Sequence, residues 1–143
     1  MELFDEAALA IDEMNSNKLD TALSNAIAML STTDFLMEFL KPLHTYINDE
    51  CSRGSLRYIQ EKFAKVSMRN CLSNLYTKFR SAKDQGPRMI IGSLTSEDES
   101  IDTLMHIIVA QNIGWDVTYV GNSVPHDEMT FMANKIKAST IVV

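Results

Sequence analysis

The 143-residue sequence has few of the residues that cross-link or rigidify small folds: two cysteines, three prolines and five glycines. Neither Cys51 nor Cys71 lies in a C-x-x-C motif or beside paired histidines, which argues against a disulfide framework and against a zinc site. No uncharged apolar run approaches the roughly 18 residues that a membrane span needs. No secretory leader is recognisable either, so we expect a soluble, cytoplasmic protein.

Basic residues are also scarce. Lys and Arg total 13 against 19 Asp and Glu, for a formal net charge of -6. An acidic chain repels a polyanionic backbone, so direct binding of nucleic acid is not expected. Hydrophobic residues make up 45% of the chain and charged residues 22%, as in ordinary globular proteins, and the chain should therefore bury a core.

The first 83 or so residues show the three- and four-residue apolar spacing of amphipathic helices and no convincing strand. We predict four helices in an antiparallel bundle, at about residues 3–14, 18–30, 33–54 and 55–82. Thr33 or Asp34 is the expected N-cap of the third helix, and Pro42 is expected to kink it. The inward stripe of the fourth helix is predicted to be Leu56, Ile59, Phe63, Val66, Cys71, Leu72, Leu75, Tyr76 and Phe79.

The pattern changes at the Gly86-Pro87 pair, after which short apolar runs alternate with helical stretches. We predict a fold of class α/β, in which a four-helix bundle over residues 1–85 precedes a partial doubly wound, flavodoxin-like parallel sheet over residues 86–143. The expected order is β-α-β-α-β with right-handed crossovers. Its predicted elements are strands at Met89–Gly92, Trp115–Gly121 and Thr140–Val143 and helices at Glu97–Ile113 and Pro125–Lys137.

A parallel sheet of three strands is smaller than this architecture normally has. If the third strand lies beside the first, residues 140–143 present an unpaired apolar edge. We therefore expect either that the chain is a fragment of a longer protein or that a partner completes the sheet.

The loop after the first predicted strand reads Gly92-Ser-Leu-Thr-Ser-Glu-Asp-Glu99. It lacks the glycines and the lysine with which phosphate-binding loops hold nucleotides. Ser96 and Glu99 fit a helix capping box, which explains the acids well; a hard-metal site using Glu97, Asp98 or Asp102 is the weaker alternative. No zinc set and no Ser/His/Asp set can be assembled, so catalysis is not expected.

Residues 114–125, Gly-Trp-Asp-Val-Thr-Tyr-Val-Gly-Asn-Ser-Val-Pro, look like the second strand and following loop of the cobalamin-binding domain family. A helical bundle followed by β-α-β-α-β is similar to the cobalamin modules of methionine synthase, of corrinoid methyltransferase proteins and above all of MerR-type light-sensing transcriptional regulators. The resemblance covers nearly the whole chain and implies a helical cap over a cobalamin-binding sheet domain.

The sequence departs from the family at its ligand positions. The lower-ligand motif D/E-x-H-x-x-G falls on residues 97–102, where Glu99 replaces the axial histidine and Asp102 the glycine. The cap's Glu-His pair falls on Glu61-Lys62, and the cap tryptophan on Cys51. The cofactor-binding set that the resemblance implies is Ser93, Glu97, Glu99, Asp102 and Gly121 in the sheet region and Cys51, Glu61 and Lys62 in the helical region, with cobalamin as the expected cofactor.

Three functions stay open at this point. The first is a sensory or regulatory domain of a transcription regulation system, which holds a tetrapyrrole or other small ligand between its lobes and signals by self-association or through a regulatory protein partner. The second is a ligand-free protein interaction module. The third, a corrinoid carrier subunit of a methyltransferase, is disfavoured because Glu99 is a harder and poorer ligand for cobalt than imidazole.

Overall fold

The computed structural model describes residues 2–82, 86–93 and 101–143. It divides into two compact units, Met1–Cys71 and Leu72–Val143. The division falls within one long helix, whereas the predicted domain boundary lies near residue 85 and stays a prediction. In the described part of the chain, no helix is both long enough and apolar enough to cross a membrane.

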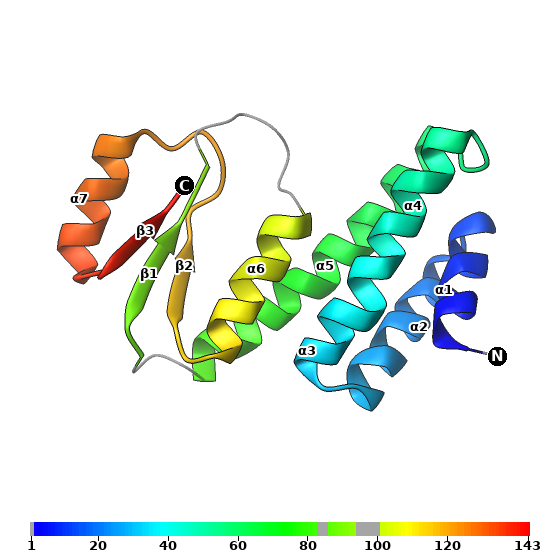
Figure 1. Ribbon diagram of the computed structural model, residues 1–143, viewed down its shortest axis with the longest axis horizontal. Helices are drawn as coiled ribbons and strands as arrows, with labels where there is room; N and C mark the ends of the chain where they lie inside the picture. Colours follow the sequence, from blue (N-terminus) through cyan, green and yellow to red (C-terminus); the bar gives the residue numbers. More distant parts are fainter. Residues whose placement is uncertain (1, 83–85, 94–100) are drawn as a thin grey trace. The chain divides into compact units, whose positions relative to one another are not determined.

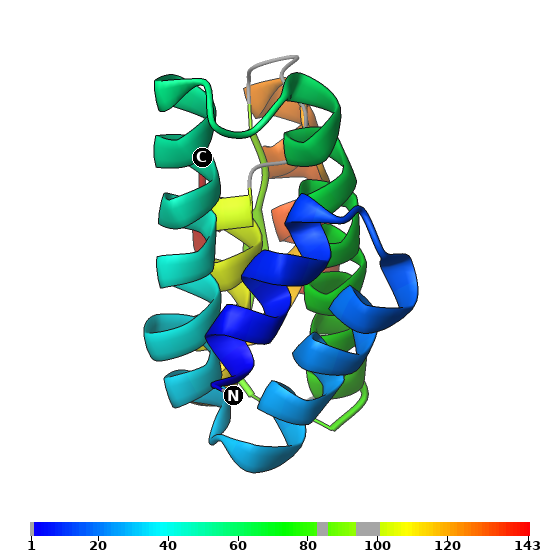
Figure 2. The same cartoon turned by 90° about the vertical axis from the view of Figure 1, so that its right-hand side faces the viewer.

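The first unit is helical, as predicted (Figure 1). Asn15 caps its second helix by accepting a hydrogen bond from the backbone N–H of Lys18 at 3.0 Å. Figure 2 shows the first two helices side by side. The helices are α1 (Leu3–Asp12), α2 (Ser16–Met29), α3 (Thr32–Asp34), the π-helix η1 (Phe35–Leu40), α4 (Lys41–Arg53) and the start of α5 (Tyr58–Ala82).

The predicted third helix runs without a break from α3 through η1 to α4, and its details differ from the prediction. Its N-cap is Ser31, whose hydroxyl accepts from the N–H of Asp34 at 3.1 Å, so the expectation of Thr33 or Asp34 was wrong. Pro42 has no N–H to donate and its ring would crowd the carbonyl of Glu38. The backbone widens there into a π-helix, in which the Lys41 N–H reaches back to the carbonyl of Leu36.

Aromatic rings contribute to the core of this unit. Phe4 from α1 meets Phe39 and Tyr46 edge to face, with ring centroids 6.4 and 5.8 Å apart, and Phe35 stacks on Phe39. The buried side-chain amide of Gln60 donates to the carbonyl of Asp12 at 2.9 Å and so ties α5 to the end of α1.

The inward stripe of α5 was predicted incorrectly at two positions. Ile59 and Val66 are 59% and 49% exposed. The first turns of α5 instead bury Gln60, Ala64 and Met68. Because Gln60 is polar and Ala64 small, neither carries a hydrophobic signal, and the larger exposed residues on the neighbouring face dominate the sequence pattern.

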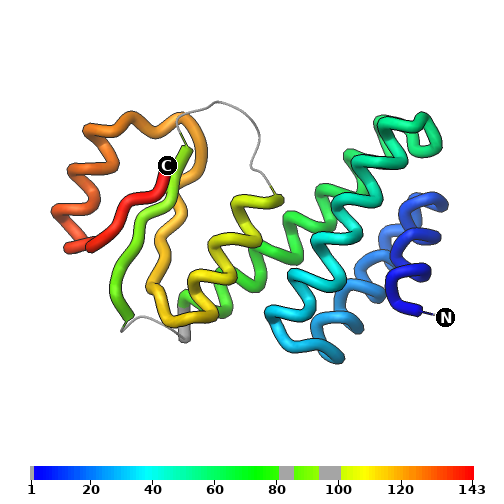
Figure 3. The backbone as a smooth tube through the Cα atoms, viewed as in Figure 1, coloured from blue at the N-terminus to red at the C-terminus, as the bar shows by residue number. Residues whose placement is uncertain are grey.

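The second unit holds three parallel strands (Figure 3). Their order is β2-β1-β3, so the third strand lies beside the first as predicted, and the α/β fold class is confirmed. Helices α6 and α7 lie on opposite faces of the sheet (Figure 1). The elements are β1 (Arg88–Ile91), α6 (Ile101–Asn112), β2 (Asp116–Tyr119), α7 (His126–Ile136) and β3 (Thr140–Val142).

The last turns of α5 cover the outer edge of β2. The backbone N–H of Tyr119 points away from β1 and donates to the hydroxyl of Tyr76 at 3.0 Å. The side-chain amide of Gln111, fully buried on α6, donates to the carbonyl of Tyr76 at 3.1 Å. No strand covers the outer edge of β3 in the part of the chain that the structure describes, and Ile141 and Val142 are 38% and 41% exposed.

Replacing Tyr76 by Phe tests how much the hydrogen bond to the backbone N–H of Tyr119, at the outer edge of β2, stabilises the fold. We expect Tyr76→Phe to lower the free energy of unfolding by about 1 kcal/mol, because the part-buried N–H of Tyr119 loses the hydroxyl of Tyr76 as its acceptor. Tyr58→Phe on the same helix is the matched control, since Tyr58 is 72% exposed. Urea unfolding measures the difference, and amide exchange at Tyr119 should accelerate only in Tyr76→Phe; equal effects of the two variants would contradict the assignment.

Candidate functional site

The carboxyl ends of the parallel strands meet at one edge of the sheet, where open α/β folds bind their ligands. The loop after β1 and the loop after β2 are joined there by two backbone hydrogen bonds. The N–H of Ser93 donates to the carbonyl of Gly121 at 3.0 Å, and the N–H of Val124 donates to the carbonyl of Ser93 at 3.1 Å. The structure therefore brings together two residues of the predicted set, Ser93 and Gly121.

Two glycines are favoured by the geometry of this edge, each for a different reason. A Cβ at Gly92 would lie 2.9 Å from Cγ2 of Val120 and 3.1 Å from Cε of Met129, so a side chain there would require these two neighbours to shift. Gly121 has a φ of 82°, a left-handed conformation that disfavours any side chain, and open space beyond its Cα. We call the loops at 92–93 and 121–124 the strand-end site.

The acids predicted to complete this site are only partly described. Asp102 lies in the first turn of α6 with its side chain exposed. Glu97 and Glu99 lie outside the described residues. Among the described residues, no three His, Cys, Asp or Glu side chains are grouped so that they could hold a metal ion.

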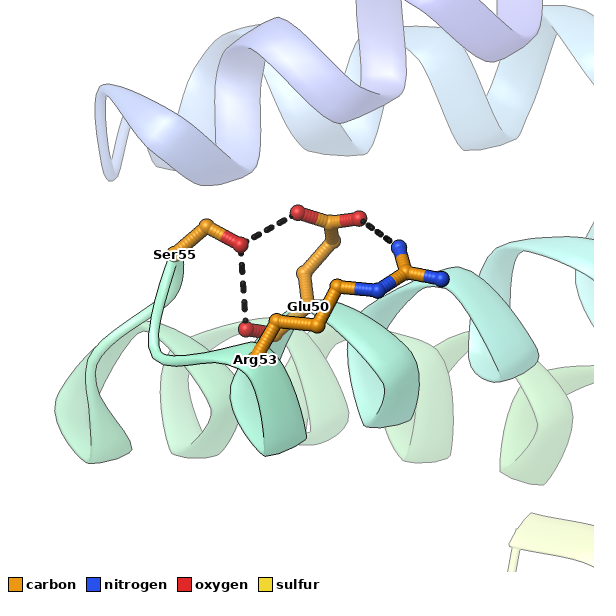
Figure 4. Close-up of polar contacts among 3 residues, drawn as sticks. All are labelled: Glu50, Arg53 and Ser55. Carbon is orange, nitrogen blue, oxygen red and sulfur yellow. Dashed lines mark hydrogen bonds and ion pairs between the residues drawn. The ribbon is translucent and has the colours of Figure 1, made fainter.

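In the helical unit, the corner between α4 and α5 is organised around Glu50 (Figure 4). Its carboxylate accepts hydrogen bonds from the Ser55 hydroxyl and from Arg53, the latter at 2.8 Å. Gly54 closes α4 in a left-handed conformation, with a φ of 82°. The Ser55 hydroxyl, and to a smaller extent the Arg53 guanidinium, lower the pKa of Glu50. This corner fixes the direction in which α5 begins.

Cys51 and Glu61, two predicted cap residues, are in contact across this corner. The Cys51 thiol donates to the backbone carbonyl of Arg57 at 4.0 Å and lies near the Glu61 carboxylate, which pairs with Lys65 at 3.6 Å. Burial, and then the neighbouring Glu61 carboxylate, raise the pKa of Cys51. The Cys51 thiol and the charge of Lys65 lower the pKa of Glu61. A thiol held protonated in this way is a poor nucleophile and a poor metal ligand.

Lys62, the third predicted cap residue, is oriented differently. Successive residues on an α-helix point about 100° apart, so Lys62 cannot share the direction of Glu61. Its ammonium lies 5.2 Å from the centroid of the Tyr58 ring. The side chain also lines a groove of about 550 Å³ between α5 and the start of α2. The sequence did not reveal this groove, because Ile59 and Val66 on its wall were assigned to the core.

Comparison with known proteins adds little about identity. No family model matches the chain, and no curated protein matches it. A solved structure described as a novel cobalamin-binding protein from Desulfitobacterium hafniense DCB-2 shares 12% sequence identity with it. That match covers 99% of this chain and 67% of the other, with a TM-score of 0.42.

The contacts of Glu50 predict the direction in which the stability of the fold changes with pH. Because the pKa of Glu50 is lowered in the folded chain, its contacts stabilise the fold above the unfolded pKa, and the gain is lost as pH falls through the folded pKa. We expect Ser55→Ala to move the pKa of Glu50 back up toward its ordinary value, measured by carboxyl NMR titration. The exposed neighbour Ser52→Ala is the control; an unchanged pKa in Ser55→Ala would contradict the contact.

The thiol–carboxylate contact is tested by the reactivity of Cys51. We expect Glu61→Gln to lower the pKa of Cys51, since a negative charge is removed and Lys65 is left beside the thiol. Alkylation of Cys51 by iodoacetamide at pH 8 should become about two- to fivefold faster, measured by peptide mapping. Cys71, whose pKa burial raises to about 11, is the internal reference, and Glu38→Gln is the control. Unchanged alkylation of Cys51 in Glu61→Gln would refute the contact.

Proposed function

We propose that this chain is a sensory or regulatory module with the topology of a cobalamin-binding domain, and that it binds a tetrapyrrole or another small ligand at the strand-end site. The observation that carries the proposal is the β2-β1-β3 parallel order with Ser93 hydrogen-bonded to Gly121 at the carboxyl ends of the strands. This is the position at which flavodoxin-like sheets bind their ligands. The resemblance of residues 114–125 to the cobalamin-binding family names the ligand class.

The residues do not fit a cobalamin held through an axial histidine. The three histidines are His44, His106 and His126, on α4, α6 and α7, and none lies in the loop that follows β1. The sequence places Glu99 at the position of the family's histidine. A corrinoid in this site would have to be held through its ring and its side-chain amides.

We infer a binding role in preference to a catalytic one. Burial and the neighbouring Glu61 carboxylate raise the pKa of Cys51, the thiol at the corner between α4 and α5, and a raised pKa weakens it as a nucleophile. A carrier subunit that moves methyl groups would depend on the cobalt of its corrinoid. The carboxylate of Glu99 is a poorer ligand for cobalt than an imidazole. Transcriptional output would come from a DNA-binding partner protein, because the acidic chain itself is not suited to DNA.

A ligand-free interaction module is the second candidate. The observation that favours it is the outer edge of β3, where the uncharged strand Thr140–Val142 has two large apolar side chains more than a third exposed. Such an edge pairs readily with a strand from another chain.

Ligand binding is tested by titrating the protein with hydroxocobalamin and, separately, with haem while recording absorption spectra. We expect altered bands for a tetrapyrrole, and about tenfold weaker binding in Gly121→Ala, whose left-handed backbone lies in the site. Gly54→Ala is a closely matched control, because Gly54 has the same φ of 82° and lies elsewhere. Glu99→His should tighten hydroxocobalamin binding, since imidazole suits cobalt better than carboxylate.

One result would decide against the sensor, and another against the strand-end site. A folded protein that changes neither spectrum would favour the interaction module. Equal losses in Gly121→Ala and Gly54→Ala would show that binding does not involve the strand-end site.

A further inference from the structure

One surface of the helical unit leaves apolar side chains uncovered. Ile59 and Val66, two turns apart on α5, are 59% and 49% exposed. Met14, in the turn between α1 and α2, is 46% exposed. These three residues and the half-buried Phe63 line the groove of about 550 Å³ described above. A contiguous apolar patch of this kind on a soluble unit commonly marks a contact surface.

Met14 adds to the patch at a cost in backbone conformation. Its φ of 52° lies in the left-handed region, which glycine or asparagine adopts more easily at the end of a helix. A methionine in this conformation is less stable than a glycine, because its Cβ crowds the backbone. The side chain gains no burial in the core in return, and it extends the apolar wall of the groove.

The groove carries one charge of each sign. Asp20 on α2 and Lys62 on α5 both line it, and they are not paired with each other. Lys62 lies over the ring of Tyr58, and within the described residues Asp20 has no ion-pair partner. A surface that packs over this groove should therefore present apolar side chains, a cation for Asp20 and an anion for Lys62.

A second copy of the same chain meets all three requirements. In a two-fold interface the same patch is used twice, so residue i of one copy contacts residue j of the other and the reverse. We propose that the surface around this groove is the interface of a homodimer. In this dimer, Lys62 of each copy pairs with Asp20 of the other, and the exposed Ile59 and Val66 side chains of the two copies pack together at the two-fold axis. The proposal does not depend on the proposed ligand, whose site lies in the second unit.

The interface is tested by sedimentation equilibrium of the full chain without added ligand. We expect reversible dimerisation. Lys62→Asp and Asp20→Lys should each raise the dissociation constant roughly tenfold or more, because each places like charges opposite one another. The double variant Lys62→Asp/Asp20→Lys should restore dimerisation, since the swapped charges again match. Lys78→Asp, an exposed change on α5 outside the groove, is the control and should leave the constant unchanged.

A further variant keeps the test independent of charge and of folding. Ile59→Ser replaces a side chain that is already exposed, so it should preserve the helical circular dichroism spectrum while weakening the dimer roughly tenfold or more. Met29→Ser, at a residue 73% exposed outside the groove, is its control. A chain that stays monomeric at all concentrations, or a dimer that Ile59→Ser and the charge swap leave unaltered, would overturn the proposal.

Discussion

The parallel pairing of β1 with a strand on each side positions everything in the second unit that bears on function. The ladder continues past the last residue of β1: the N–H of Gly92 donates to the carbonyl of Val142, and the N–H of Val120 donates to the carbonyl of Ile91, each at 3.0 Å. Because the strands run in one direction, the loops after β1 and β2 leave the sheet at the same edge. The contact of Ser93 with Gly121 is a direct result of this register.

The two outer edges of the sheet are treated differently. The hydroxyl of Tyr76 accepts from an outward N–H of β2, while β3 exposes the side chains of Ile141 and Val142.

In the first unit, the corner at Glu50 and Gly54 positions side chains as β1 does in the second unit, because it sets where α5 begins and so brings Glu61 near Cys51. In both units, backbone geometry at an element's end decides which side chains meet.

Much of the fold could be predicted because periodicity and breakers are local signals. The helical spacing of the first half, the Gly86-Pro87 break and the alternation of strands and helices afterwards were sufficient for the α/β class, and the strand order is that of the flavodoxin-like sheet expected from this alternation. The direction of single side chains was harder to predict. Ile59 and Val66 were placed in the core because α5 buries Gln60 and Ala64, which carry no hydrophobic signal. Ser31 was missed as a cap because three further residues of capping type, Thr32, Thr33 and Asp34, follow it.

The candidate site shows the same division. Ser93 and Gly121 were predicted through the family resemblance from their positions at strand ends, and Cys51 and Glu61 from their spacing in the same family pattern; the positions at strand ends are local features of the chain. The raised pKa of Cys51 and the groove lined by both Asp20 and Lys62 arise only when distant segments pack together. The sequence by itself determined which elements form and in what order. The tertiary structure alone decided which faces they bury, because burial depends on the shape of the neighbouring helix as much as on the residue's own hydrophobicity.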